Sequence, residues 1–245
     1  MRVHRVFIGT LSEGERVLTG SEAQHLVGVL RAGPGARVRA FDGRGLEASG
    51  VVTETDALRV VLKLEKPALS DAEASLEITL AVALLKGDKL SDVVRQGTEL
   101  GVTRFIPILS ERCDVRELSV NKLERLRRIA QEAAKQSGRS VVPVVSDVQK
   151  LGSLSLDGFG LVAQPQAETT LRAVLSEQVL SEQLLSEHTR ARVTVVTGPE
   201  GGLTPAEVDG LKVKGARAVR LGARILRAET APIALAAALL IPEAL

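Results

Sequence analysis

The fold is constrained most by two glycine-bearing segments near the C-terminus. They are Gly-Pro-Glu-Gly-Gly at 198–202 and Leu-Gly-Ala-Arg-Ile-Leu-Arg-Ala-Glu-Thr-Ala at 221–231. Each follows a run typical of a buried strand, 193–196 or 216–220, and each precedes a helix-like stretch. A repeated strand, glycine loop and helix is how an α/β sheet builds a ligand site at the carboxyl ends of its strands. The sequence therefore predicts an α/β domain with a ligand site at these loops.

The pattern of the chain changes near residue 70. Residues 1–66 contain closely spaced strand-like runs, which are typical of a small β-barrel, and one helical stretch at 21–30. Residues 67–75 are polar and acidic, and from residue 76 strands alternate with helices, as in a mostly parallel sheet. We therefore predict two domains, a small barrel over 1–70 and an α/β domain over 71–245.

The expected elements follow from turn residues, caps and periodicity. Strands are predicted at 37–41, 46–53, 58–64, 76–85, 105–109, 141–145, 161–163, 193–197 and 217–221, and helices at 89–101, 121–137, 169–188 and 230–240. The 169–188 helix contains a five-residue repeat that matches no helical period, so we interpret it as a surface helix or an insert without chemistry. The 230–240 helix is almost wholly Ala, Leu and Ile, so we expect it to be buried, in part against a second subunit.

Charge and aromatic content limit the possible partners. The net charge is +2, but basic residues outnumber acidic ones within 104–139 and 190–227. Such an excess fits a polyanion, although ordinary helix-surface charge produces the same count. The chain has no Trp or Tyr and four Phe. Base stacking on aromatic side chains is therefore not expected, and any RNA contact relies on Arg, Lys and backbone groups.

Cysteine and histidine usage argues against a metal site. Cys113 is the single cysteine, so neither an internal disulfide nor a cysteine-based metal cage can form, and the three histidines are widely spaced. No apolar signal segment follows Met1, and the longest apolar stretch, 233–241, is too short to span a bilayer. We expect a cytoplasmic protein that binds no metal and no membrane.

The 198–202 loop allows close approach of the backbone to a ligand. Thr204, Pro205 and Glu207 predict a capping box at the start of the next helix. The loop is then either an ordinary strand-to-helix turn or a phosphate cradle at a helix N-terminus. It lacks the glycine patterns of P-loops and dinucleotide-binding turns, which argues against ATP or NAD.

Two charged residues of the second loop are candidates for chemistry. Arg227 lies between the apolar pair Ile225-Leu226 and the predicted buried helix, where an unpaired guanidinium would be costly, so we favour a functional role. Glu229 precedes the same helix, and for this residue a capping role and a catalytic role fit equally well.

A series of short motifs runs in a fixed order along nearly the whole chain. In the first domain they are His25-Leu26, Val29-Leu30-Arg31 and Phe41-Asp42-Gly43; in the second they are Lys86-Gly87-Asp88-Lys89, Glu99-Leu100-Gly101-Val102, Pro107, Ser110-Glu111-Arg112, Glu132-Ala133-Ala134, Gln136-Ser137-Gly138-Arg139, Pro143 and the two glycine loops. With these motifs the chain resembles the RsmE family of SPOUT methyltransferases, which transfer methyl from S-adenosyl-L-methionine to N3 of a uridine in small-subunit ribosomal RNA. The repeat within 169–188 departs from the family pattern.

The resemblance implies a PUA-like RNA-binding barrel, a SPOUT α/β domain with a mostly parallel sheet and a trefoil knot, and a homodimer. It implies that S-adenosyl-L-methionine binds three loops through Ala163, Gln164, Thr197, Gly198, Glu200, Gly201, Gly202, Leu221, Gly222, Ile225, Leu226 and Thr230. Uridine N3 is a poor nucleophile until it loses its proton, so we assign Arg227 to stabilising the anion and Glu229 to accepting the proton. RNA phosphates are expected at Arg2, Arg5, Arg31, Arg112 and Arg139.

Two other functions remain open. A non-catalytic RNA-binding factor in ribosome assembly would use the same basic surface, but it would need no methyl-donor pocket. A SPOUT enzyme acting on transfer RNA would share the pocket, and the barrel domain argues against it by analogy. The motifs specify neither the uridine that is modified nor whether free RNA or an assembled subunit is the substrate.

Overall fold

The computed structural model of this chain describes residues 3–56, 58–176 and 191–241. The chain divides into two compact units, the first formed by Met1–Glu73 and Ala134–Val142 and the second by Ala74–Ala133 and Pro143–Leu245. The sequence-based division at residue 70 lies close to Glu73. It did not anticipate that the chain returns to the first unit at 134–142.

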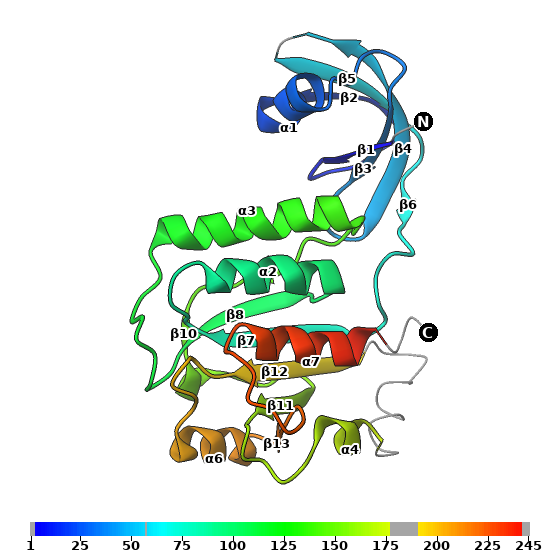
Figure 1. Ribbon diagram of the computed structural model, residues 1–245. Helices are drawn as coiled ribbons and strands as arrows, with labels where there is room; N and C mark the ends of the chain where they lie inside the picture. The colour runs from blue at the N-terminus through cyan, green and yellow to red at the C-terminus, as the bar shows by residue number, and fades with distance from the viewer. Residues whose placement is uncertain (1–2, 57, 177–190, 242–245) are drawn as a thin grey trace. The chain divides into compact units, whose positions relative to one another are not determined.

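The first unit is a curved sheet of six strands (Figure 1). The strand order is β1-β3-β4-β5-β2 with β6 on β4; β1 and β3 are parallel and the other pairs are antiparallel. Its elements are β1 (His4–Phe7), β2 (Gly14–Thr19), α1 (Gly20–Gln24), η1 (His25–Val29), β3 (Arg37–Phe41), β4 (Leu46–Thr55), β5 (Arg59–Leu64) and β6 (Ala68–Leu69). Alternating apolar residues of these strands form one core cluster with Leu26 of η1.

The predicted helix at 21–30 is not a single α-helix. Helix α1 ends at Gln24, and η1 is a π-helix in which the Leu30 amide donates to the His25 carbonyl, 3.0 Å away. The wider turn leaves Val29 exposed, and Arg31, just after it, has a φ of 51°. A non-glycine residue in this left-handed region is uncommon, and π-turns often lie at functional sites.

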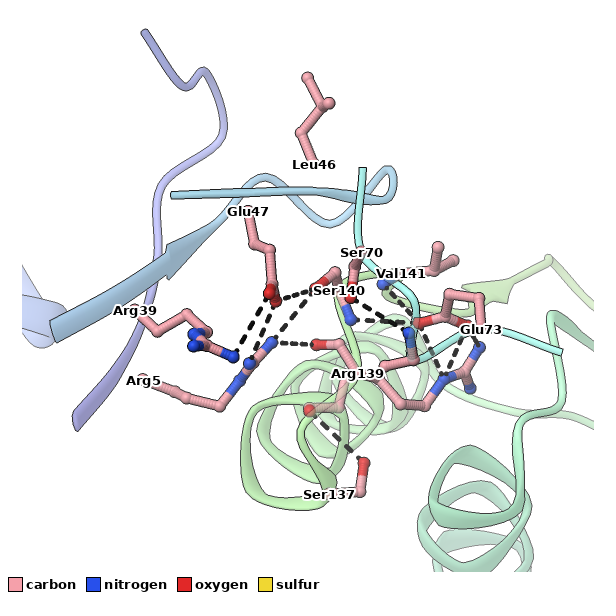
Figure 2. Close-up of polar contacts among 12 residues, drawn as sticks. Arg5, Arg39, Leu46, Glu47, Ser70, Glu73, Ser137, Arg139, Ser140 and Val141 are labelled. Carbon is pink, nitrogen blue, oxygen red and sulfur yellow. Dashed lines mark hydrogen bonds and ion pairs between the residues drawn. The ribbon is translucent and has the colours of Figure 1, made fainter. Parts of the chain in front are cut away.

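A buried ion pair joins the two chain segments of the first unit (Figure 2). Arg139 donates to Glu73 at 2.7 Å, and the two side chains are only 4% and 8% exposed. The same carboxylate accepts hydrogen bonds from the amides of Ser140 and Val141 at 3.1 and 3.0 Å. The charges are therefore both paired and hydrogen-bonded, as burial of ions requires.

The second unit is an α/β domain built on a sheet of seven strands, in the order β10-β8-β7-β12-β11-β13 with β9 on β8. Every strand pair is parallel. The elements are β7 (Glu77–Ala83), α2 (Lys89–Leu100), β8 (Arg104–Leu109), α3 (Val120–Ser137), β9 (Val144–Val145), β10 (Gln149–Lys150), η2 (Leu151–Ser153), β11 (Phe159–Ala163), α4 (Leu171–Leu175), β12 (Arg192–Thr197), α6 (Pro205–Val213), β13 (Ala216–Val219) and α7 (Thr230–Leu240). The last turn of α3 belongs to the first unit.

The order of the strands brings together the loops that form the ligand site. Strand β12 lies between β7 and β11, and its residues Val193–Thr197 are all buried, as expected for a parallel strand covered on both faces. Strand β11 pairs with both neighbours near its end: its Val162 lies beside Val196 of β12, and its Ala163 lies beside Val219 of β13. The carboxyl ends of β11, β12 and β13 are therefore neighbours, and so are the loops that follow them.

Helix α7 returns from the edge strand β13 to the middle of the sheet, where it packs on α2, β7 and β12 (Figure 1). Its predicted burial is confirmed for five residues, Pro232, Leu235, Ala236, Leu239 and Leu240.

Three further predicted elements differ from the structure in their extent. The predicted strand at 141–145 is only Val144–Val145, because Val141 bridges to Gly43 and Arg44 and Pro143 has no amide to donate. The strand predicted at 217–221 is Ala216–Val219, and Arg220 after it forms only an isolated bridge with Thr170. Of the helix predicted at 169–188, α4 covers Leu171–Leu175, and residues 177–190 lie outside the described part.

Glu73→Gln should lower the free energy of unfolding by about 3–5 kcal/mol, because it removes the buried carboxylate that is paired with the buried Arg139 guanidinium. Urea denaturation followed by circular dichroism measures the change. Glu65→Gln, at an exposed position of the same unit, is the control and should change little. An equal, small effect of both substitutions would show that the pair does not hold the two segments together.

Candidate active site

A cavity of about 430 Å³ opens at the carboxyl ends of β11, β12 and β13. Its walls come from residues within 163–165, 197–203 and 219–231, together with Lys89 at the start of α2. This is the size of a small-molecule site, and it lies where an open parallel sheet places one.

Most residues predicted to bind a cofactor line this cavity: Ala163, Gln164, Thr197, Gly198, Glu200, Gly202, Leu221, Gly222, Ile225 and Leu226. Gly201 and Thr230 do not. A Cβ on Gly201 would lie 3.3 Å from Cβ of Arg112, so this glycine faces the neighbouring segment, and Thr230 is exposed at the first turn of α7.

Sequence reasoning missed further cavity residues: Lys89, Pro165, Pro199, Leu203, Val219, Arg220, Arg224, Ala228 and Ala231. For Lys89 a signal existed, because Lys86-Gly87-Asp88-Lys89 follows β7 directly. Its relevance depends on β7 lying next to β12, which the order of the elements along the chain does not reveal.

Three side chains of the cavity carry buried polar atoms without hydrogen-bond partners. They are Oγ1 of Thr197, Nε of Arg220 and Oε2 of Glu229, and in the described part of the chain only Arg5 adds a fourth such atom. Buried polar groups are normally paired, and leaving one unpaired costs about 1–3 kcal/mol. The concentration of these atoms at one cavity indicates that they serve a polar ligand.

A charge cluster lies at the same cavity. Nζ of Lys89 is 2.8 Å from Oε1 of Glu200 and 3.5 Å from Oε2 of Glu229. The hydrogen bond with Glu200 raises the pKa of Lys89. Burial acts to raise the pKa of Glu200, but hydrogen bonds from Lys89 and from backbone amides outweigh it, so this pKa lies below its usual value.

The glycine loop after β12 is braced by the predicted capping box, which is confirmed. Oγ1 of Thr204 accepts from the Glu207 amide at 3.3 Å, and the Glu207 carboxylate accepts from the Thr204 amide at 2.8 Å. The Glu111 amide also donates to Glu207 at 2.7 Å, and Arg112 donates to the Gly201 carbonyl at 3.2 Å. The 198–202 loop is thus held from outside the cavity.

The loop after β13 turns through Gly222, whose φ of 107° suits only glycine. Further along, Arg227 is 84% exposed at the cavity and lies 3.9 Å from Glu229, so the expectation of a guanidinium enclosed by apolar neighbours was wrong. The apolar pair did not enclose it because Ile225 is itself 80% exposed. Glu229 occupies the N-cap position of α7, but its side chain makes no capping hydrogen bond, which favours another role.

The arginines expected to contact RNA occupy different environments. Arg31 and Arg112 are exposed, and Arg2 lies outside the described residues. Arg139 is buried against Glu73, and Arg5 donates to the Arg139 carbonyl at 2.8 Å. These two guanidinium groups are engaged within the first unit (Figure 2), which corrects the expectation that they are available to phosphates.

Among the described residues, no group of three or more His, Cys, Asp and Glu side chains is arranged to hold a metal ion. Within the same ranges, no helix has the length and apolar character needed to cross a membrane.

The sequence is similar to known protein families over both units of the chain. Residues 72–240 match the model of an RNA methyltransferase domain, and residues 18–65 match that of an RNA methyltransferase PUA domain. The class is therefore that of RNA methyltransferases with an N-terminal PUA domain.

The relatives define the family more narrowly. The chain is 33% identical to ribosomal RNA small subunit methyltransferase E of Bacillus subtilis, over 88% of this chain and 86% of the relative. It is 37% identical to the Synechocystis protein of the same name, over 90% and 71%. The chain belongs to the ribosomal RNA small subunit methyltransferase E family, which confirms the resemblance inferred from its motifs.

A solved structure supports the same assignment. The crystal structure of the Neisseria gonorrhoeae ribosomal RNA small subunit methyltransferase E, bound to S-adenosyl methionine, has a TM-score of 0.84 to this chain. It is 31% identical in sequence and the match covers 97% of both chains. The predicted fold class, a SPOUT α/β domain with a parallel sheet that follows a PUA domain in the sequence, is confirmed.

Glu200→Gln should make stability less dependent on acid pH. Folding lowers the pKa of Glu200, so its carboxylate stabilises the fold above its usual pKa, about 4.3, and that contribution disappears as pH falls through the lower folded value. The wild type should therefore melt above Glu200→Gln at pH 7, and this difference in melting temperature should narrow when the pH is lowered to about 3. The exposed Glu65→Gln serves as control, and a gap that is equal at both pH values would contradict the assignment.

Proposed function

We propose that this protein transfers a methyl group from S-adenosyl-L-methionine to N3 of a uridine in small-subunit ribosomal RNA. The observation that carries the proposal is the cavity at the ends of β11, β12 and β13, where unpartnered polar atoms are gathered. The family of the chain and the donor-bound relative support it.

The residues of the cavity fit this methyl donor. Leu221 and Leu226 offer apolar surface for an adenine ring, while the Thr197 hydroxyl and the backbone groups of the 198–202 loop offer polar contacts. The bound donor supplies the activated methyl group, and the protein supplies orientation, since displacement at the methyl carbon requires an in-line approach.

Arg227 and Glu229 are proposed to act on the uracil. Uridine N3 must lose a proton before it can attack the methyl carbon. Arg227, exposed at the cavity, can approach a uracil carbonyl oxygen and stabilise the negative charge that develops there. Glu229 lies beside it with a buried carboxylate oxygen that accepts no hydrogen bond from the described residues and is held by the ion pair with Lys89 alone, and we assign this carboxylate to accepting the N3 proton.

Contact with RNA phosphates is proposed for Arg31 and Arg112, the exposed arginines of the predicted set, and for Arg2. The strained turn at Arg31 supports its role, because a residue held in an uncommon backbone conformation presents its side chain at a fixed angle. Because the proposed substrate is ribosomal RNA, we propose that the protein acts in the cytoplasm.

A homodimer is proposed through α7. Apolar side chains at positions 233, 234, 237, 238 and 241 are half-buried or exposed and follow the spacing of one helix face. A second copy of the chain that covered this stripe would remove it from water.

The two alternative functions make different demands on the cavity. A ribosome-assembly factor without catalytic activity would not need the methyl donor. An enzyme acting on transfer RNA would need the donor, and the small-subunit ribosomal RNA named for the family's members favours the present proposal over it.

Thr197→Val should weaken binding of S-adenosyl-L-methionine about 2–10-fold, the worth of one neutral hydrogen bond, without lowering the melting temperature. Stability is spared because the Thr197 hydroxyl has no partner within the described fold. Calorimetric titration and thermal melting measure the two effects.

Thr194→Val is the matched control on the same strand. Its hydroxyl accepts from the Asp157 amide and donates to the Asp157 carbonyl, both at 2.9 Å, so this substitution should lower stability and leave donor affinity unchanged. A wild-type protein that fails to bind the donor would favour the assembly factor.

Arg227→Ala should lower the single-turnover rate of methyl transfer about 10²–10³-fold while changing donor affinity little, because its contribution arises in the transition state. The rate should also depend more steeply on pH in the variant, which lacks the cation that favours the N3 anion. Glu229→Gln should bind normally and lose rate. A wild-type rate and pH profile in Arg227→Ala would remove this residue from the mechanism.

A further inference from the structure

Lys89 is a cation at a position where the helix itself disfavours positive charge. It is the first residue of α2, and a cation there faces the positive end of the helix dipole. No side chain caps this end, and the first acidic residue of the helix is Asp92. The side chain of Lys89 is nevertheless held in place, since it is only 34% exposed and points to two carboxylates.

The two carboxylates come from different loops of the cavity. Glu200 belongs to the loop after β12 and lies 2.8 Å from Nζ of Lys89. Glu229 ends the loop after β13 and lies 3.5 Å from the same nitrogen. One ammonium group on a third element therefore connects the two loops that form the cavity.

The Glu229 carboxylate lies within ion-pair distance of two cations, Lys89 and Arg227. Its Oε2 faces Lys89, and its Oε1 lies 3.9 Å from Arg227, which has no other carboxylate within 4.0 Å among the described residues. Lys89 is anchored by Glu200, whereas Arg227 is 84% exposed. Without Lys89, the Glu229 carboxylate would have only the Arg227 guanidinium as an ion-pair partner within 4.0 Å among the described residues, and their attraction would hold Arg227 against Glu229.

We propose that Lys89 is a positioning residue for methyl transfer: it holds Glu229 through an ion pair, which keeps the pairing between Glu229 and Arg227 weak and leaves the Arg227 guanidinium available to the target base. The inference rests on the proposed function. It differs from a role in donor binding, because Lys89 acts on the reaction through Glu229 and Arg227.

The test is a double-mutant cycle measured by single-turnover methylation at saturating donor and RNA. Lys89→Met should lower the rate about tenfold or more in the wild-type background. In the Glu229→Gln background no carboxylate remains to capture Arg227, so the same substitution should change the rate less than about twofold. Lys89→Arg keeps the charge and should recover most of the rate.

Lys86→Met is the matched control. Lys86 lies three residues earlier, pairs with Asp114 at 2.8 Å and does not line the cavity, so its loss should leave the saturated rate unchanged. Melting temperatures of all variants report whether each one folds.

The outcomes separate the possibilities. An equal fall in rate in both backgrounds would show that Lys89 acts independently of Glu229 and overturn the inference. So would a Lys89→Met protein that loses donor affinity but keeps its saturated rate, since Lys89 would then be a donor ligand. A wild-type protein that does not methylate small-subunit RNA would instead reject the proposed function.

Discussion

The insertion of β12 between β7 and β11 is the constraint on which the site depends. In a parallel sheet all carboxyl ends lie at one edge, so this order brings together the loops after β11, β12 and β13 and the start of α2 after β7. Residues far apart in sequence, such as Lys89 and Glu229, thereby reach one cavity. Helix α7 then packs on β7 and β12, and Glu229 at its N-cap lines the cavity.

Two arginines of the molecule lie in opposite environments, one buried in an ion pair and one exposed at the cavity. In the first unit, Arg139 is buried and ion-paired with Glu73, an arrangement that stabilises one conformation and keeps the guanidinium from a ligand. At the cavity, Arg227 is exposed and only weakly paired. A guanidinium that must stabilise charge in a transition state has to be available, and the weak ion pair at Arg227 meets that requirement.

Sequence patterns predicted those parts of the fold that depend on local chemistry. The capping box at Thr204 and the buried α7 both follow from residues close in sequence, and both are present. Strand order is not local, so the contribution of Lys89 to the cavity could not be foreseen. The burial of Arg139 could not be predicted from the sequence either, because it depends on Glu73, a partner distant in sequence. The π-helix at η1 arises from one widened turn that helical periodicity does not register.

The central claim is that the cavity and the exposed Arg227 serve methylation of a uridine in small-subunit ribosomal RNA. It is tested most directly by incubating the protein with isotopically labelled S-adenosyl-L-methionine and unmodified small ribosomal subunits or their free RNA. Nuclease digestion and mass spectrometry then locate the label. The account predicts one labelled nucleoside, identified as N3-methyluridine. Label on another base or atom, label only on added transfer RNA, or no transfer at all would contradict it.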